Sequence, residues 1–257
     1  AADLGVRPTI YAGLPGAGKT KSTAAPYNWE LTQPTKVFKY YDLLASIFIV
    51  VLLISNLVAQ KICNFGGYSV SGAQLLFPIT YIFGDVFTEV YGYGASRRII
   101  WIGFAASALM AGLGNLIVAL PGDPDWHNQQ AFATVFHQYP RIILASLLAY
   151  WCGEFANSFT LAKMKIFTSG RHLWTRTVGS TVVGQAVDTP IVMVVGFAGV
   201  LPMTLIGKLI LAGYLFKVAY EVLATPLTYW IVGFLKRSEG VDKYDYDTRF
   251  TPFATEM

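Results

Sequence analysis

Long apolar stretches recur from Tyr40 to Leu235, and they restrict the fold of this chain more than any other feature of its sequence. Hydrophobic residues make up 54% of the chain and charged residues only 13%, whereas soluble domains usually contain about 25% charged residues. A helix needs about 20 mainly apolar residues to cross the hydrocarbon core of a bilayer. We therefore predict an all-α membrane protein with one polytopic domain. Six segments are expected to cross the bilayer: Tyr40–Ile62, Gln74–Tyr91, Arg98–Leu120, Arg141–Met164, Thr175–Val200 and Leu205–Leu235. The glycine-rich run NFGGYSVSGAQ between the first two should form a tight hairpin or fold back towards the interior.

The first 35 residues differ in composition from the rest of the chain. They are rich in Gly, Pro, Thr and Ala, and Gly13–Thr20 (GLPGAGKT) matches the Walker A pattern. A phosphate-binding loop of this kind needs a strand before it and a helix after it. Pro26 limits the following helix to about one turn, and no further strands follow. We interpret residues 1–35 as a flexible tail that need not be native, residues 36–237 as the transmembrane domain, and residues 238–257 as a cytoplasmic C-terminal tail.

The distribution of Lys and Arg predicts the orientation. If the N-terminus lies in the cytoplasm, 15 of the 19 basic residues fall in inside segments, and three, Lys61, Arg141 and Lys208, fall at outside ends. Cytoplasmic segments of membrane proteins carry an excess of Lys and Arg. Both termini are therefore expected in the cytoplasm. The basic residues form no continuous stripe, so nucleic acid is not an expected partner.

Two acids, Asp85 and Glu89, lie near the middle of the second predicted span, in the stretch Gln74–Arg98. Their spacing of four residues places them on one face of a helix. A charged side chain at the bilayer centre costs about 2.5–3.5 kcal/mol on insertion scales. Gly84 has no side chain and would let another backbone or a ligand come close to Asp85. We expect both acids to face the protein interior and to bind a ligand.

Four other predicted spans each carry a polar pair at helical spacing. If these pairs converge, they form a polar cavity at mid-depth, as in transporters built from repeats. Structural roles are also open, because Lys217 and Glu221 can neutralise each other along their helix and amides can hydrogen-bond between helices. The candidate binding residues are Asn56, Gln60, Asp85, Glu89, Glu154, Asn157, Gln185 and Asp188, and Lys217 and Glu221 are candidates for proton or structural coupling.

A weak internal repeat links the two halves. SNLVAQK in the first predicted span is similar to ANSFTLAK in the fourth, and Asp85 in the second corresponds to Asp188 in the fifth, with an offset of about 102 residues. The first and fourth spans should run in opposite directions. Equivalent segments of opposite direction indicate a 3+3 inverted-topology repeat.

Enzymatic signals are few. The chain contains neither G-x-S-x-G nor H-E-x-x-H, and its three histidines lack zinc-ligand spacing. We therefore expect no catalytic residue, metal or cofactor. An intramembrane enzyme that uses the acids for proton transfer remains an alternative.

The runs KYYDLLASIFIVVLLISNLVAQKI, GAQLLFPITYIFGDVFTEVYGYGASRRIIWIGF and GQAVDTPI resemble the queuosine precursor transporter family of bacterial inner-membrane proteins. The resemblance covers Lys39 to Leu235, and FGDVFTEVYG followed by Arg97–Arg98 is its most specific part. The tail that contains GLPGAGKT lies outside the family pattern.

This resemblance implies uptake of 7-cyano-7-deazaguanine, 7-aminomethyl-7-deazaguanine or both by alternating access. A guanine-like base presents N1–H and N2–H₂ side by side, and one carboxylate can accept from both. Asp85, Glu89 and Asp188 are the expected acceptors. The aminomethyl compound is cationic and would suit a second acid. Proton coupling and facilitated diffusion both remain open, as does a binding subunit that needs a separate ATPase module. Membrane lipid is an expected partner, and a homodimer is compatible with the sequence.

Overall fold

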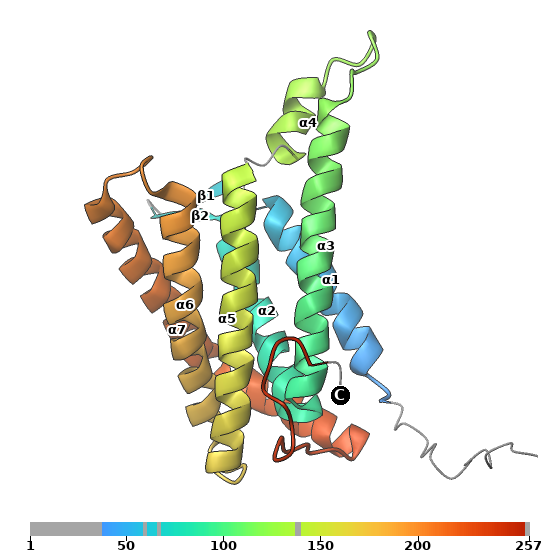
Figure 1. Ribbon diagram of the computed structural model, residues 1–257, viewed down its shortest axis with the longest axis vertical. Coiled ribbons are helices and arrows are strands. Elements are labelled where there is room, and N and C mark those ends of the chain that lie inside the picture. The colour runs from blue at the N-terminus through green and yellow to red at the C-terminus, as the bar shows by residue number, and fades with distance from the viewer. Residues whose placement is uncertain (1–37, 59–60, 66–67, 137–139, 255–257) are drawn as a thin grey trace, which may run out of the picture. The chain divides into compact units, whose positions relative to one another are not determined.

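The structure, a computed structural model, describes residues 38–58, 61–65, 68–136 and 140–254 (Figure 1). The predicted tail, its Walker A-like stretch and Gln60 lie outside the described residues. Helices dominate the described chain. The elements are α1 (Tyr41–Val58), β1 (Ile62–Phe65), β2 (Tyr68–Ser71), α2 (Gly72–Val86), the π-helix η2 (Phe87–Tyr91), α3 (Tyr93–Ala119), α4 (Gln129–Phe136), α5 (Pro140–Phe167), α6 (Leu173–Phe197) and α7 (Met203–Glu239).

Five helical stretches in the described chain are long and apolar enough to cross a membrane. Four of them are α1, α3, α6 and α7, and the fifth lies in the part of the chain that holds α4 and α5. The expectation of a multi-pass, all-α membrane protein is thus confirmed. The second expected span folds as α2 followed by η2 and is not one of the five, so a total of six spans stays a prediction.

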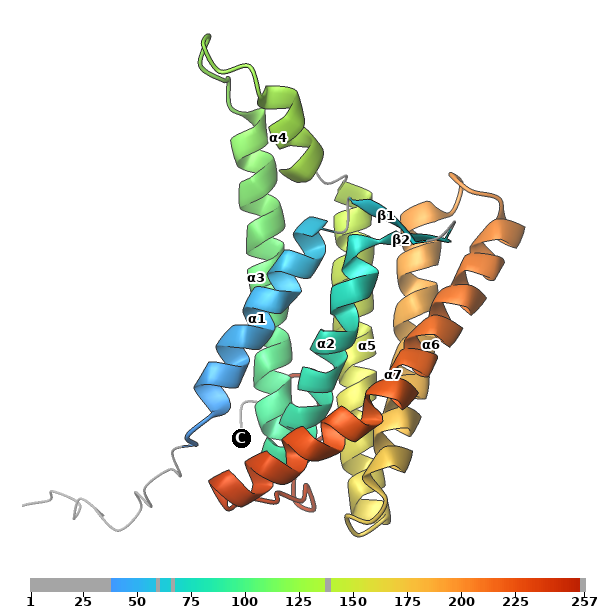
Figure 2. The same ribbon diagram turned by 180° about the vertical axis from the view of Figure 1, so that it is seen from behind.

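The main helices alternate in direction. In Figure 1, α1 and α3 run upwards whereas α2 and η2 run downwards between them in sequence. The directions are reversed in the second half, where α5 and α7 run downwards and α6 upwards. Figure 2 shows α7 crossing the bundle obliquely past α2. Each of the three helical segments of the first half therefore runs in the opposite direction to the corresponding segment of the second half.

The segment η2 lies at the centre of the packing. All five of its residues are at most 1% exposed. Phe87 contacts Phe48 of α1 edge-on, with ring centroids 6.0 Å apart, and Tyr91 contacts Tyr41 in the same way at 5.2 Å. Because π-helical turns often occur at functional sites, the surroundings of η2 are a natural place to look for one.

Helices α5 and α6 approach each other closely at two glycines. A Cβ atom on Gly153 of α5 would lie 2.7 Å from Cβ of Asp188, and one on Gly184 of α6 would lie 2.8 Å from Cβ of Asn157. Small residues let membrane helices pack backbone to backbone. These contacts place Asp188 beside Gly153 and Asn157 beside Gly184, about one helical turn apart along the antiparallel pair.

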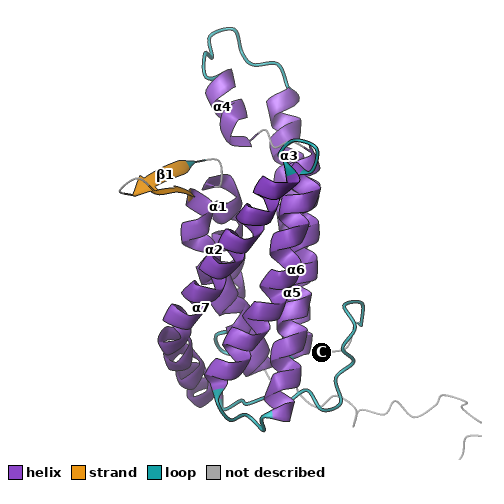
Figure 3. Cartoon of the chain, turned by 90° about the vertical axis from the view of Figure 1, so that its left-hand side faces the viewer, coloured by secondary structure: helices purple, strands orange, loops and turns teal. Residues whose placement is uncertain are grey.

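Short segments close the two ends. Strands β1 and β2 pair antiparallel, with Ile62 opposite Ser71 and Phe65 opposite Tyr68 (Figure 3). This pairing is compatible with the first of the two arrangements expected for the glycine-rich run, a hairpin. At the other end, the chain after α7 returns along α3. Arg97 Nη1 donates to the carbonyl oxygen of Thr251 at 3.1 Å, and the backbone N–H of Tyr93 donates to Asp245 at 3.0 Å.

Candidate functional site

The two acids of the second predicted span lie in different surroundings, although both are fully buried. Asp85 is in α2 and Glu89 is in η2. Their partners differ, because Asp85 accepts from Asn157 whereas Glu89 pairs with Arg176, Lys165 and Lys236. We therefore describe Asp85 and Glu89 as members of two clusters.

Asp85 faces α5 and is only partly satisfied. Its Oδ1 accepts a hydrogen bond of 2.9 Å from Nδ2 of Asn157, which is 7% exposed. Within the described residues, Oδ2 of Asp85 and Oδ1 of Asn157 have no hydrogen-bond partner. A buried polar atom without a partner is destabilising by about 1–3 kcal/mol. Two buried acceptor atoms therefore lack a hydrogen-bond donor at this point in the described chain.

Two further acids surround Asp85. Glu221 of α7 is 2% exposed, and its Oε1 also has no partner among the described residues. The charges of Glu221, of Glu154 on α5 and of Glu89 all act on Asp85. Oε2 of Glu154 lies 3.0 Å from the position that a Cβ on Gly84 would take. The absence of a side chain at Gly84 thus lets the carboxylate of Glu154 approach the backbone of α2, where the sequence predicts the approach of a backbone or a ligand.

An ion pair continues the cluster towards α6. Nζ of Lys217 lies 2.5 Å from Oδ2 of Asp188, and both side chains are partly exposed, at 19% and 16%. Thr189 Oγ1 accepts from Lys217 Nζ at 3.4 Å and donates to Gln185 Oε1 at 3.4 Å. The charges of Asp188 and Lys217 also act on Glu154, which joins this pair to the group around Asp85.

The partner of Lys217 differs from the structural alternative that the sequence leaves open. Along α7, Glu221 is one turn away and was an available partner, but no ion pair joins the two side chains within the described residues. Lys217 instead reaches across to α6 because Asp188 presents a carboxylate there. Glu221 is buried, and no cation pairs with it among the described residues.

The acids Asp85, Glu154 and Glu221, the amides Asn157 and Gln185, and the Asp188–Lys217 ion pair are hereafter called the acidic cluster. It combines side chains of α2, α5, α6 and α7. Asn56 is not brought into the cluster by a described contact, because its Nδ2 donates to the carbonyl oxygen of Leu52 on its own helix at 3.1 Å. Gln60 lies outside the described residues.

Glu89 belongs to a second cluster, which links η2 to α5, α6 and α7. Arg176 of α6 donates to both carboxylate oxygens, with Nε to Oε2 at 2.6 Å and Nη2 to Oε1 at 2.8 Å. Lys236 of α7 lies 2.5 Å from Oε1, and Lys165 of α5 lies 3.6 Å from it. Bidentate Arg–carboxylate pairs are strong and geometrically specific. Glu89 is therefore fully compensated, and it joins η2 to three helices.

The C-terminal segment completes this second cluster. Oδ1 of Asp242 lies 2.6 Å from Nζ of Lys165 and 2.8 Å from Nζ of Lys236. Burial alone would raise the pKa of Asp242, but the hydrogen bonds from both lysines outweigh it and lower this pKa below its usual value. Glu89, Lys165, Arg176, Lys236 and Asp242 are hereafter called the ionic lock. In the sequence, the three cations of the ionic lock serve only to predict the orientation in the membrane. Their position near helix ends is the only sequence feature that points to them.

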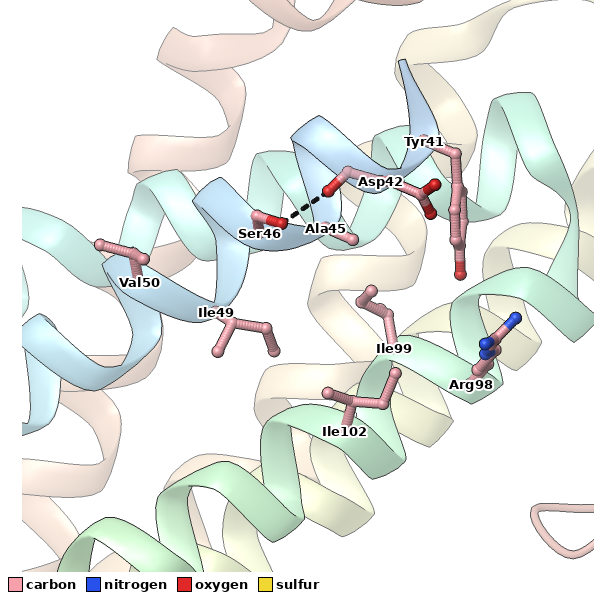
Figure 4. A pocket seen from close by; sticks show the side chains of 9 residues that line it. All are labelled: Tyr41, Asp42, Ala45, Ser46, Ile49, Val50, Arg98, Ile99 and Ile102. Atoms are coloured by element: carbon pink, nitrogen blue, oxygen red, sulfur yellow. Dashed lines mark hydrogen bonds between the residues drawn. The ribbon is translucent and has the colours of Figure 1, made fainter. Parts of the chain in front are cut away.

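A groove lies apart from both clusters, between α1 and α3 (Figure 4). Its walls are mostly apolar, with Ile49, Val50, Ile99 and Ile102 along them and Asp42 and Arg98 near one end. It contains none of the residues that the sequence singles out for binding. The candidate site is therefore the acidic cluster.

Apolar helices that surround an interior cluster of partly unsatisfied acids are more typical of a multi-pass membrane transporter than of an enzyme. The comparisons with known proteins agree. The family described as "Putative vitamin uptake transporter" matches residues 71–231, and the chain belongs to this family. It is also similar to the "Probable queuosine precursor transporter" of Bacillus subtilis (strain 168), with 29% identity over 177 residues that cover 68% of this chain and 77% of the relative. Membership of the queuosine precursor transporter family, expected from the sequence, is thus confirmed, and both matches are transporters. No solved structure matches the chain.

Proposed function

We propose that this protein imports queuosine precursors across the bacterial inner membrane and that the acidic cluster is its binding site. One observation carries the proposal: buried Asp85 and Asn157 each keep an acceptor atom without a partner in the described chain. The family and the name of the Bacillus relative supply the substrate class. The substrates would be 7-cyano-7-deazaguanine, 7-aminomethyl-7-deazaguanine or both.

The chemistry of a 7-deazaguanine suits these atoms. Its N1–H and N2–H₂ groups are adjacent donors, which a carboxylate and an amide oxygen can accept. We assign them to Oδ2 of Asp85 and Oδ1 of Asn157, with Glu154, Gln185 and Asp188 lining the remainder of the site. Asn56 is a further candidate of the first span, and Gln60, also a candidate, lies outside the described residues. Tyr81, whose ring centroid is 5.7 Å from Nζ of Lys217, is suitably placed for stacking on the base.

The position of the acidic cluster between two halves suits alternating access. Asp85 lies in the first three helical segments and its partner Asn157 lies in the last three, and these triplets run in opposite directions (Figure 1). We infer six spans, with α2 and η2 forming the second, arranged as a 3+3 inverted repeat. Both termini would then be cytoplasmic.

The ionic lock would be the inner gate of this transporter. Glu89 ties η2 to α6 through Arg176 and to α7 through Lys236, and Asp242 ties the C-terminal segment to α5 through Lys165. Separation of the helices at this end requires these pairs to break. This arrangement favours a gating role for Glu89 over direct contact with substrate. Protonation of Glu221, or release of Lys217 from Asp188, could couple the movement to a proton gradient.

Binding by the purified, full-length chain tests the site. Asp85→Asn keeps the shape of the side chain but replaces the unpartnered acceptor by an amide group. We expect it to weaken the binding of 7-aminomethyl-7-deazaguanine at least about tenfold in calorimetric titration, because a buried hydrogen bond to a charged group is worth about 1.5–3 kcal/mol. Asp125→Asn, which makes the same change in an exposed loop, should bind like the parent. Parent-like binding by Asp85→Asn would remove Asp85 from the site.

A further inference from the structure

The acidic cluster and the ionic lock differ in charge balance. In the lock, Glu89 and Asp242 face three cations, all within 3.6 Å of a carboxylate oxygen. In the acidic cluster, the described chain supplies one cation, Lys217, and Asp188 already holds it. The buried acid of the ionic lock is thus fully compensated by cations, whereas the acidic cluster has fewer positive than negative charges.

Three acids of the acidic cluster have no cationic partner in the described chain. Asp85, Glu154 and Glu221 are 0%, 6% and 2% exposed, and the only side-chain donor found for Asp85 is the neutral amide of Asn157. Burial of a charge is strongly unfavourable unless the charge is paired. In the empty protein, protons can neutralise these acids. A bound cation would do so directly.

The unpartnered atoms point to the same kind of ligand. Asp85 Oδ2, Asn157 Oδ1 and Glu221 Oε1 are all acceptors. The fourth unpartnered buried atom in the described chain, Trp151 Nε1, is a donor, and its ring packs edge-on against Trp101 and Phe155. These acceptors belong to α2, α5 and α7, and the described chain supplies no donor for any of them. A ligand rich in N–H groups and positively charged would satisfy both the hydrogen bonds and the charge.

We propose that the site selects a cationic ligand and that Glu221 is the counter-ion of its ammonium group. This inference rests on the proposed function and goes further, since it makes the aminomethyl precursor the favoured substrate over the uncharged cyano precursor. Asp85 and Asn157 then receive the donors of the base, and Glu221 on α7 receives the exocyclic amine. Because α7 also carries Lys236 of the ionic lock, neutralisation of Glu221 acts on the helix that holds the inner gate closed.

Three ligands separate charge from shape in a calorimetric binding experiment on the full-length protein. The first is 7-aminomethyl-7-deazaguanine, the second is its hydroxymethyl analogue, which has nearly the same shape but no charge, and the third is 7-cyano-7-deazaguanine. The parent protein should bind the aminomethyl compound at least about tenfold more tightly than either neutral compound. Glu221→Gln should bring the ratio of aminomethyl to hydroxymethyl affinity close to one. Asp125→Asn, an acid-to-amide change on the surface, should keep the parent ratio.

The possible results are distinct. Equal affinity of the parent for charged and neutral compounds would overturn the inference and leave the proposed function intact, and this comparison needs no variant. A parent-like ratio in Glu221→Gln would overturn the assignment of Glu221. If none of the three compounds binds, both the inference and the proposed substrate class are wrong.

Discussion

Removal of the negative charge of Glu89 should destabilise the protein far more than removal of a surface acid. Glu89, Arg176 and Lys165 are 0%, 2% and 1% exposed, so solvent barely screens their interactions. Glu89→Gln leaves three cations with Asp242 as their only anion in the ionic lock. Removal of one partner from a buried ion pair costs about 3–5 kcal/mol, because the remaining charge stays buried without compensation.

The size of the expected effect makes it easy to measure. For a chain of this size, 1 kcal/mol shifts the midpoint of thermal unfolding by about 2–4 °C. Glu89→Gln should therefore lower Tm by roughly 10 °C in a thermal melt of the detergent-solubilised protein. Asp247→Asn, which changes an exposed acid in the C-terminal segment, should remain within about 2 °C of the parent.

A double substitution tests whether the effect comes from the ion pair itself. In Glu89→Gln with Arg176→Gln, one unpaired cation is removed with its partner, so the combined loss should be clearly smaller than the sum of the single losses. If Glu89→Gln melts like the parent and instead weakens the binding of substrate, Glu89 is a ligand-binding residue and the lock does not hold this end together.

Two further predictions concern stability. The pKa of Asp242 is lowered in the folded protein by its two lysine partners, although burial opposes this. The stability that ionised Asp242 contributes to the fold is therefore fully present above its unfolded pKa of 3.8. It is lost as the pH falls through the lower pKa of the folded protein. Because this side chain is 44% exposed, Asp242→Asn should reduce the loss of Tm below about pH 4 only slightly, as melts between pH 3 and 7 would show. Gly153→Ala should destabilise by about 1–3 kcal/mol, since its new Cβ would lie 2.7 Å from Cβ of Asp188, whereas Gly112→Ala in α3, with nothing within 4 Å, should be neutral or slightly stabilising in the same melts.

Hydropathy predicts much of the helical architecture because each span is a local property of about 20 residues. The first expected span, Tyr40–Ile62, corresponds to α1 at Tyr41–Val58, and the fifth, Thr175–Val200, corresponds to α6 at Leu173–Phe197. Helix α3 starts at Tyr93, five residues before the expected Arg98, because its first N–H is capped by Asp245 from the far end of the chain. A contact over 152 residues leaves no signal in a local hydropathy window.

The candidate site was predictable as a set of buried polar residues but not as a pattern of partners. Helical spacing groups Glu154 with Asn157, and both side chains reach α2. The same rule suggests one role for Asp85 and Glu89, but their partners differ, because only Glu89 is paired with cations among the described residues. Which cation meets which acid depends on how α6 and α7 pack, and sequence spacing carries no information about that.

Uptake by liposomes that contain only this protein tests the central claim most directly. With labelled 7-aminomethyl-7-deazaguanine outside at sub-saturating concentration, we predict saturable uptake that Asp85→Asn reduces about tenfold and Asp125→Asn preserves. An inward proton gradient in the same vesicles shows whether transport is coupled to protons. Binding of the label to the purified protein without any uptake would contradict the account, because the chain would then be a binding subunit that depends on another module for transport.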